Sequence, residues 1–255
     1  MFVVTSDRIV SLADWSMPLN HAFLYGTSEF STMRLSDGKF YFYFKHLARL
    51  QNKLGLKNIL EKVRSNFPEG EWSVRPTFYH SSTDLYTTSE EKLLVLVKPL
   101  VKKIHQEVPV VLTLTERGTK NRLGIGQQKI GQYFSETKYP ETLFHDGIKI
   151  LESNVSNIFF RIKDKYFFPQ DEASIFWGIG IECFYKFCCE QSVECYSGSF
   201  RLDDIKTMDE AWVISSVRGL RAVAQIEEKK ISVNDNISKK LLEKFKINLQ
   251  ENFYL

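Results

Sequence analysis

Residues 151–160 read Leu151-Glu152-Ser153-Asn154-Val155-Ser156-Asn157-Ile158-Phe159-Phe160. The apolar residues around this segment predict two short strands, at 148–151 and 158–162, and the polar residues between them predict a short loop. Glu152 stands where the first strand meets the loop, so we expect its carboxylate to be partly buried. A glutamate at a strand end that faces water would give the same pattern.

Outward from this segment, predicted strands and helices follow one another irregularly, with no internal repeat or low-complexity stretch, which favours an α+β fold over a doubly wound sheet. Short apolar or β-branched runs between breakers predict further strands at 40–44, 72–79, 93–98, 110–115, 142–145, 166–168 and 211–214. Helical spacing predicts helices at 46–54 with Gly55 as the C-cap, in a segment ending near 137, at 179–189 and from 237 onwards.

Charged residues and a glycine interrupt the apolar pattern at 115–119, and we place a domain boundary there. The sequence therefore predicts a smaller N-terminal α+β domain at 1–116, whose sheet includes the strand at 110–115. A larger C-terminal α+β domain is expected at 117–255.

The composition limits the possible functions. The 255 residues, 43% hydrophobic and 25% charged, can bury a core and enclose a pocket. A formal net charge of +3 without a basic stripe argues against a nucleic-acid partner. The four cysteines lie between residues 183 and 195 without paired CxxC spacing, so we expect reduced thiols and no metal site. No signal segment or long apolar run is recognisable, and we expect a soluble cytoplasmic protein without a membrane partner.

Four segments carry a more specific pattern. They are LYGTSEFSTMR at 24–34 with HLARL at 46–50, GTKNRL at 118–123, the segment at 151–160, and WGIGI at 177–181 with MDEAWVISS at 208–216. In this order, from about residue 2 to about residue 226, they resemble the class IV aminotransferases, a family that includes branched-chain aminotransferases, D-amino acid aminotransferases and aminodeoxychorismate lyase. The resemblance implies fold type IV: two α+β domains with pyridoxal 5′-phosphate in the cleft between them, and a homodimer.

This cofactor is an electron sink, and it needs a lysine, a partner for its ring nitrogen and a cradle for its phosphate. Lys120 resembles the family's catalytic lysine, which would hold the cofactor as an imine and move the substrate proton. Lys129 and Lys138 are its rivals, and a solvated surface lysine is the structural alternative. Glu152 is expected to keep the ring nitrogen protonated.

The phosphate is expected at the start of the helix at 179–189, where Ile179 and Gly180 would present unpaired backbone N–H groups. Arg49 would add a bidentate contact, unless it is an exposed helix arginine. Ser216 would add a hydroxyl, although the family more often has threonine and glycine around this position.

For the substrate, the resemblance implies that Tyr25 and Arg75 hold its carboxylate, with Arg34 in direct contact or in support of the site. An aminotransferase would exchange an amino group between an amino acid and a 2-oxo acid. The alternative within the family is 4-amino-4-deoxychorismate lyase, which eliminates pyruvate from aminodeoxychorismate to give 4-aminobenzoate. Outside the enzymes, the alternative is an inactive family member that acts as a binding protein.

Overall fold

Two compact units make up the chain, each built on its own sheet. The computed structural model describes residues 1–16, 28–80, 90–100, 109–117, 141–232 and 236–252. The first unit comprises Met1–Ile104 with Asn248–Leu255, and the second comprises His105–Ile247. Both combine strands and helices, so the predicted α+β class is confirmed.

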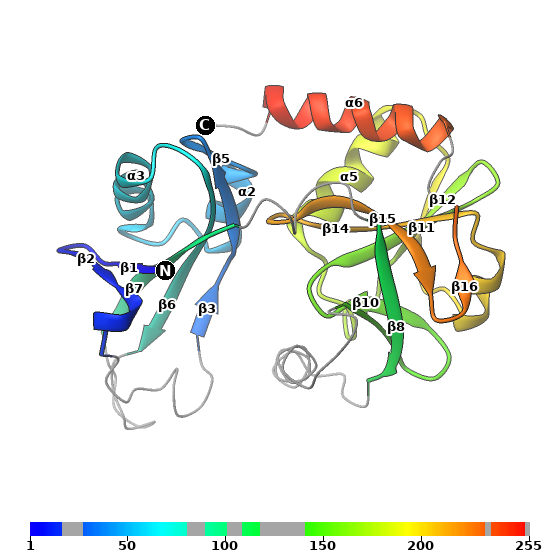
Figure 1. Cartoon of the computed structure of the whole chain (residues 1–255), viewed down its shortest axis with the longest axis horizontal. Helices are drawn as coiled ribbons and strands as arrows, with labels where there is room; N and C mark the ends of the chain where they lie inside the picture. The colour runs from blue at the N-terminus through cyan, green and yellow to red at the C-terminus, as the bar shows by residue number, and fades with distance from the viewer. Residues whose placement is uncertain (17–27, 81–89, 101–108, 118–140, 233–235, 253–255) are drawn as a thin grey trace. The chain divides into compact units, whose positions relative to one another are not determined.

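In the described part of the first unit, an antiparallel sheet has seven strands in the order β2-β1-β7-β6-β4-β5, with β3 also pairing with β6 (Figure 1). The strands are β1 (Phe2–Val4), β2 (Ile9–Ser11), β3 (Ser28–Phe30), β4 (Met33–Ser36), β5 (Lys39–Phe40), β6 (Glu71–His80) and β7 (Glu91–Pro99). The predictions at 72–79 and 93–98 are confirmed by β6 and β7.

Helices α2 (Tyr43–Arg49) and α3 (Leu56–Asn66) complete this unit, with a 3-10 turn η1 at Leu12–Asp14. The buried residues of α3 recur at helical spacing, at Leu56, Ile59, Leu60 and Val63, and they join one core with the buried side chains of the sheet. Helix α3 was not predicted from the sequence. The helix predicted at 46–54 is wrong beyond Arg49, where α2 ends, and Gly55 is the N-cap of α3 rather than a C-cap.

The predicted strand at 40–44 is wrong beyond Phe40. Phe42 has φ of 56° and Tyr43 begins α2, so the chain turns into a helix inside the aromatic run. Phe40, Tyr43 and Leu47 are all buried in the core, and the rings of Phe40 and Tyr43 stack 5.6 Å apart. Burial of this helical face outweighs the local preference of aromatic residues for strands.

The described part of the second unit has a sheet of nine strands in the order β10-β9-β8-β15-β14-β11-β12-β13, with β16 pairing with β15. Pairing is parallel for β8 with β9, β8 with β15 and β12 with β13, and antiparallel elsewhere. The strands are β8 (Val110–Glu116), β9 (Thr142–His145), β10 (Ile150–Ser153), β11 (Asn157–Ile162), β12 (Lys165–Pro169), β13 (Cys195–Gly198), β14 (Glu210–Ser215), β15 (Gly219–Ile226) and β16 (Lys229–Lys230).

Strand β8 corrects the expected organisation. It exists as predicted, but it pairs with β9 and β15 of the second sheet rather than with the first sheet. The division between the units accordingly falls at Ile104 and His105, before β8, whereas the charge and glycine signal had indicated 116. That signal marks the end of a strand of the second unit.

Among the described residues, two helices accompany the second sheet, α5 (Ile179–Glu190) and the part of α6 (Asn236–Asn252) up to Ile247, with a 3-10 turn η3 at Leu202–Thr207. Figure 1 shows α6 running beside α5, and the ring of Phe245 lies 4.9 Å from Phe184 and 5.3 Å from Phe187. Both helices confirm the predictions, whereas the helix expected to end near 137 lies outside the described residues. No helix among the described residues is long and apolar enough to cross a membrane.

Candidate functional site

Glu152 is a buried carboxylate in the middle of β10. The strand runs two residues further than predicted, so Glu152 lies within it and is only 1% exposed. Its Oε1 accepts one hydrogen bond from Arg117 Nη1 at 3.1 Å and one from the backbone N–H of Phe176 at 3.1 Å. A charged donor and a backbone donor thus fix the carboxylate in one orientation.

Arg117 follows the last residue of β8, and its side chain is fully buried. Its Nη2 donates to the carbonyl of Ser174, and its guanidinium lies 5.3 Å from the centroid of the Phe144 ring. Its Nε has no hydrogen-bond partner among the described residues. Taking two charges out of water is costly, so an ion pair this deep is weak evidence for stability and invites a functional explanation.

Helix α5 begins beside this carboxylate. Asn157, the first residue of β11, accepts from the N–H of Gly178 at 3.0 Å through Oδ1 and donates to the Phe176 carbonyl at 2.9 Å through Nδ2. A Cβ at Gly178 would lie 2.5 Å from Asn157 Oδ1, so this approach requires glycine. The amide of Asn157 therefore sets where α5 starts, and Phe176 links that start to Glu152.

The first turn of α5 packs against the end of β14. A Cβ at Gly180 would meet Ile214 Cγ1 and the carbonyl carbon of Ser215 at 3.2 Å, and the nitrogen of Ser216 at 3.3 Å. The first N–H groups of an α-helix have no partner within the helix, and together they favour an anion. The structure thus brings three predicted phosphate residues, Ile179, Gly180 and Ser216, into one place, near Glu152.

Arg49 lies in the first unit, as the last residue of α2, and is half-buried. One turn before it, His46 is 1% exposed, and its Nδ1 contacts Ser31 Oγ at 2.7 Å. Burial, together with the charge of Arg49, lowers the pKa of His46 to about 3, so this imidazole is neutral near pH 7. His46 is a structural partner in the core rather than a proton donor.

The two predicted substrate arginines of the first unit differ in their surroundings. Arg34 Nε pairs with Glu71 Oε2 at 2.6 Å, and Ser36 Oγ donates to the other oxygen of Glu71 at 2.7 Å. Arg75 instead lies over the Phe30 ring at 3.6 Å, and its Nε has no hydrogen-bond partner among the described residues. Burial lowers the pKa of Arg75.

Lys120 and Tyr25 lie outside the described residues, as do the rivals Lys129 and Lys138. Their predicted roles therefore stay predictions.

Arg117, which contacts Glu152, and Asn157, which contacts the start of α5, were not predicted as site residues from the sequence. Asn157 belongs to the segment at 151–160, and its spacing from Glu152 was the available signal. Arg117 had no local signal, because its partners Glu152 and Ser174 are distant in sequence.

A second cluster that was not predicted joins Arg218 and Arg221 to the buried Glu141. Its Oε1 accepts hydrogen bonds from Arg218 Nη1 at 2.7 Å and from Arg221 Nη2.

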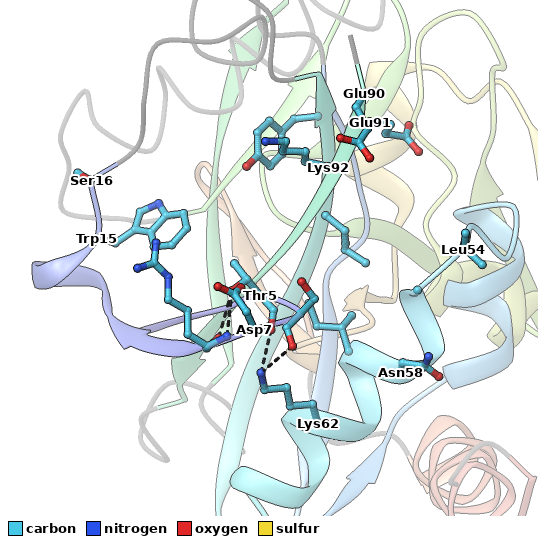
Figure 2. A pocket seen from close by; sticks show the side chains of 16 residues that line it. Thr5, Asp7, Trp15, Ser16, Leu54, Asn58, Lys62, Glu90, Glu91 and Lys92 are labelled. Carbon is cyan, nitrogen blue, oxygen red and sulfur yellow. Dashed lines mark hydrogen bonds between the residues drawn. The ribbon is translucent and has the colours of Figure 1, made fainter.

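A groove of about 870 Å³ lies elsewhere, in the first unit, between the N-terminal residues, the start of α3 and the start of β7 (Figure 2). Figure 2 shows the Lys62 ammonium reaching back to the chain at Thr5, where it donates to the carbonyls of Thr5 and Ser6 at 3.1 Å. None of the predicted site residues lines this groove. The candidate site is therefore the Glu152 and α5 cluster of the second unit.

Comparison with solved structures supports the fold. A branched-chain aminotransferase from Thermoproteus uzoniensis, solved with norvaline, has a TM-score of 0.79 and 18% identity, over 99% of this chain and 96% of that chain. The branched-chain amino acid aminotransferase from Escherichia coli has a TM-score of 0.78 and 15% identity, over 96% and 92%. A hypothetical aminotransferase from Mycobacterium tuberculosis, in a PLP-bound form, has a TM-score of 0.76 and 17% identity, over 95% and 96%.

No curated protein sequence matches the chain. The family model described as amino-transferase class IV, however, matches residues 29–226, which is most of the chain and includes Glu152, α5 and Ser216. The chain therefore belongs to the class IV aminotransferase family.

Proposed function

We propose that this protein is a pyridoxal 5′-phosphate-dependent aminotransferase that moves an amino group between an amino acid and a 2-oxo acid. One observation carries the proposal: a buried, oriented carboxylate at Glu152 lies next to a helix start that suits an anion. The two are linked within the second unit through Phe176 and Asn157.

The residues fit this cofactor in two respects. Its phosphate needs backbone N–H donors, and glycine at 178 and 180 lets the start of α5 pack closely against Asn157, Ile214 and the Ser215–Ser216 backbone, which brings the first N–H groups of the helix beside Ser216. Its pyridine nitrogen requires a carboxylate held away from water, and Glu152 is such a group. When bound, pyridoxal phosphate supplies a conjugated ring that takes up the electron pair of the substrate's α C–H bond.

The chain's own residues bind and orient the cofactor, and they transfer protons. Glu152 would hold a proton at the ring nitrogen, and the N–H groups of Ile179 and Gly180, with Ser216 and Arg49, would hold the phosphate. Lys120 would hold the cofactor and move a proton to and from the substrate α-carbon. A general base in this role contributes roughly 10²–10⁴-fold to the rate.

Arg75 is the favoured residue for the substrate carboxylate, because its buried Nε has no hydrogen-bond partner among the described residues. Arg34 is already paired with Glu71, which favours its supporting role, and Tyr25 is assigned to the carboxylate on the resemblance alone. We further propose that the protein is a cytoplasmic homodimer.

The test begins with the purified protein and pyridoxal phosphate. We expect a visible absorption band, and borohydride should fix the cofactor onto one peptide that contains Lys120. Adding single amino acids should then convert the band to that of the pyridoxamine form, and a 2-oxo acid should restore it. Fixation of the cofactor on a peptide without Lys120 would contradict the assignment of Lys120 as the residue that holds it. Formation of 4-aminobenzoate from aminodeoxychorismate, without consumption of a 2-oxo acid, would instead identify the lyase.

A further inference from the structure

Two cysteines at the end of α5 opposite to the candidate site have their sulfurs in contact. Cys189 lies in the last turn of α5, Cys195 is the first residue of β13, and their Sγ atoms are 3.4 Å apart. A disulfide needs a separation of about 2.05 Å, so only a small further approach is required. We propose that Cys189 and Cys195 form a modification site that closes to an intramolecular disulfide on reaction with an external disulfide.

Backbone hydrogen bonds hold the two cysteines at this separation. At the end of α5, the N–H of Gln191 donates to the Phe187 carbonyl at 3.0 Å, that of Ser192 to Cys189 at 3.1 Å and that of Val193 to Cys188 at 3.0 Å. On the other side, β13 pairs in parallel with β12, with Cys195 opposite Tyr166. The two thiols are thus brought together by ordered structure, and the disulfide would close a short loop that is already formed.

Accessibility separates these two thiols from the other pair. Cys189 is exposed and Cys195 half-buried, whereas Cys183 and Cys188 are buried. Burial raises the pKa of the Cys188 thiol. Burial, together with the hydrogen bond to Cys189, raises the pKa of the Cys195 thiol to about 12. The exposed Cys189 therefore reacts first with a reagent from solution, because access controls the attack.

The reaction balances with a low-molecular-weight disulfide as the oxidant. The Cys189 thiolate attacks one sulfur of the reagent, forms a mixed disulfide and releases one thiol. The Cys195 thiolate then attacks Cys189 Sγ and displaces the second reagent thiol. Two cysteine thiols lose two electrons and two protons, and the reagent gains both as two thiols.

The experiment treats the folded, full-length protein with oxidised glutathione and then quenches it in acid. We expect an intact mass that is lower by two hydrogens, a thiol count in denaturant that falls from four to two, and recovery of both with dithiothreitol. Cleavage after glutamate separates the two cysteines, because Glu190 and Glu194 lie between them, so the disulfide appears as a linked peptide pair.

Variants identify the partners. Cys189→Ser and Cys195→Ser should each abolish the linked pair, while Cys183→Ala and Cys188→Ala, the matched controls, should retain it. Glutathione that stays attached to Cys189, or no reaction of the wild-type protein, would overturn the proposal. A linked pair that persists in Cys189→Ser would overturn it as well.

Discussion

Glu152 and Arg117 form an ion pair whose two side chains are almost completely buried. Their contact at 3.1 Å joins β10 to the end of β8, and the Phe176 N–H adds a second donor to the same oxygen. A protonated ring nitrogen needs a carboxylate that is fixed in place, and these two donors orient the carboxylate of Glu152. The pair is therefore both a structural link and part of the proposed chemistry.

The first prediction concerns the charge of Glu152. Glu152→Gln keeps the shape of the side chain but removes the charge, and we expect about 100-fold lower kcat/KM in transamination, by analogy with the loss of a preorganised polar group. Glu210→Gln is the matched control, because Glu210 is also buried and pairs with Arg161 at 3.2 Å. Steady-state kinetics should show near wild-type activity for this control, and equal losses in both variants would contradict a specific role.

The second prediction concerns Arg117. Arg117→Met removes the cationic partner of the buried Glu152 side chain, and we expect the free energy of unfolding to fall by about 3–5 kcal/mol. The double variant Arg117→Met with Glu152→Gln should lose less than the sum of the single variants, as measured by urea unfolding. Strict additivity would show that the two side chains do not interact.

The third prediction concerns His46. Its pKa is lowered from 6.5 to about 3 in the folded protein, so the unfolded chain binds a proton that the folded chain does not bind between these values. The stability contributed by neutral His46 is complete above pH 6.5 and is lost as the pH falls towards 3. Relative to His46→Gln, the wild-type protein should lose about 1.4 kcal/mol of unfolding free energy per pH unit between pH 6 and 4. Denaturant unfolding at several pH values measures this, and a constant difference would contradict it.

At the scale of elements, the start of α5 is defined by glycine. Gly180→Ala would place a methyl group 3.2–3.3 Å from Ile214 Cγ1 and the Ser215–Ser216 backbone, which is closer than ordinary van der Waals contact. As the fourth prediction, we expect about 1–3 kcal/mol lower stability from overpacking and at least a tenfold weaker affinity for the cofactor. Lys186→Ala, at an exposed position of the same helix, should change neither. Fluorescence titration with pyridoxal phosphate gives the affinities. Unchanged binding by Gly180→Ala would show that the first turn of α5 does not bind the phosphate.

Elements with a strong local signal were predictable from the sequence. The apolar spacing and leading glycines of 179–189 give α5 almost to its last residue, and the β-branched runs give β6, β7 and β11. The run at 40–44 failed because core burial of Tyr43 and Leu47 selects a helix over the aromatic strand preference. The place of β8 could not be predicted either, because its partners β9 and β15 are chosen by tertiary pairing.

The residues of the candidate site also differ in how far the sequence predicts them. Glu152, Ile179, Gly180 and Ser216 lie in segments that resemble the family's motifs, and their roles toward the cofactor stay predictions. The contact of Gly180 with the Ser215–Ser216 backbone agrees with a shared site. Arg117 was not predictable, because nothing near it in the sequence shows which carboxylate it meets in the fold. Even the burial of Glu152 was underestimated, since β10 extends past the residue that seemed to begin the loop.

At the scale of the whole molecule, the fifth prediction concerns the cofactor as a ligand of the folded state. At a free concentration of about 100 times its Kd, pyridoxal phosphate should stabilise the protein by about 2.7 kcal/mol, and its removal should reverse the gain. In hydrogen exchange, we expect slower exchange at Phe176 and in the first turn of α5, and little change in β1 and β2. Protection confined to the first unit would contradict the assignment of the site.

The parallel pairing of β8 with β15 also bears on how the chain is made. All strands of the first sheet lie before residue 100, whereas the second sheet cannot join β8 to β15 until residues 219–226 have left the ribosome. At a synthesis rate of about 5–20 residues per second, the first sheet can be complete roughly 6–25 s before the second can close. During that interval one edge of β8 lacks its neighbour, and an unpaired strand edge favours aggregation of a nascent chain unless a chaperone shields it.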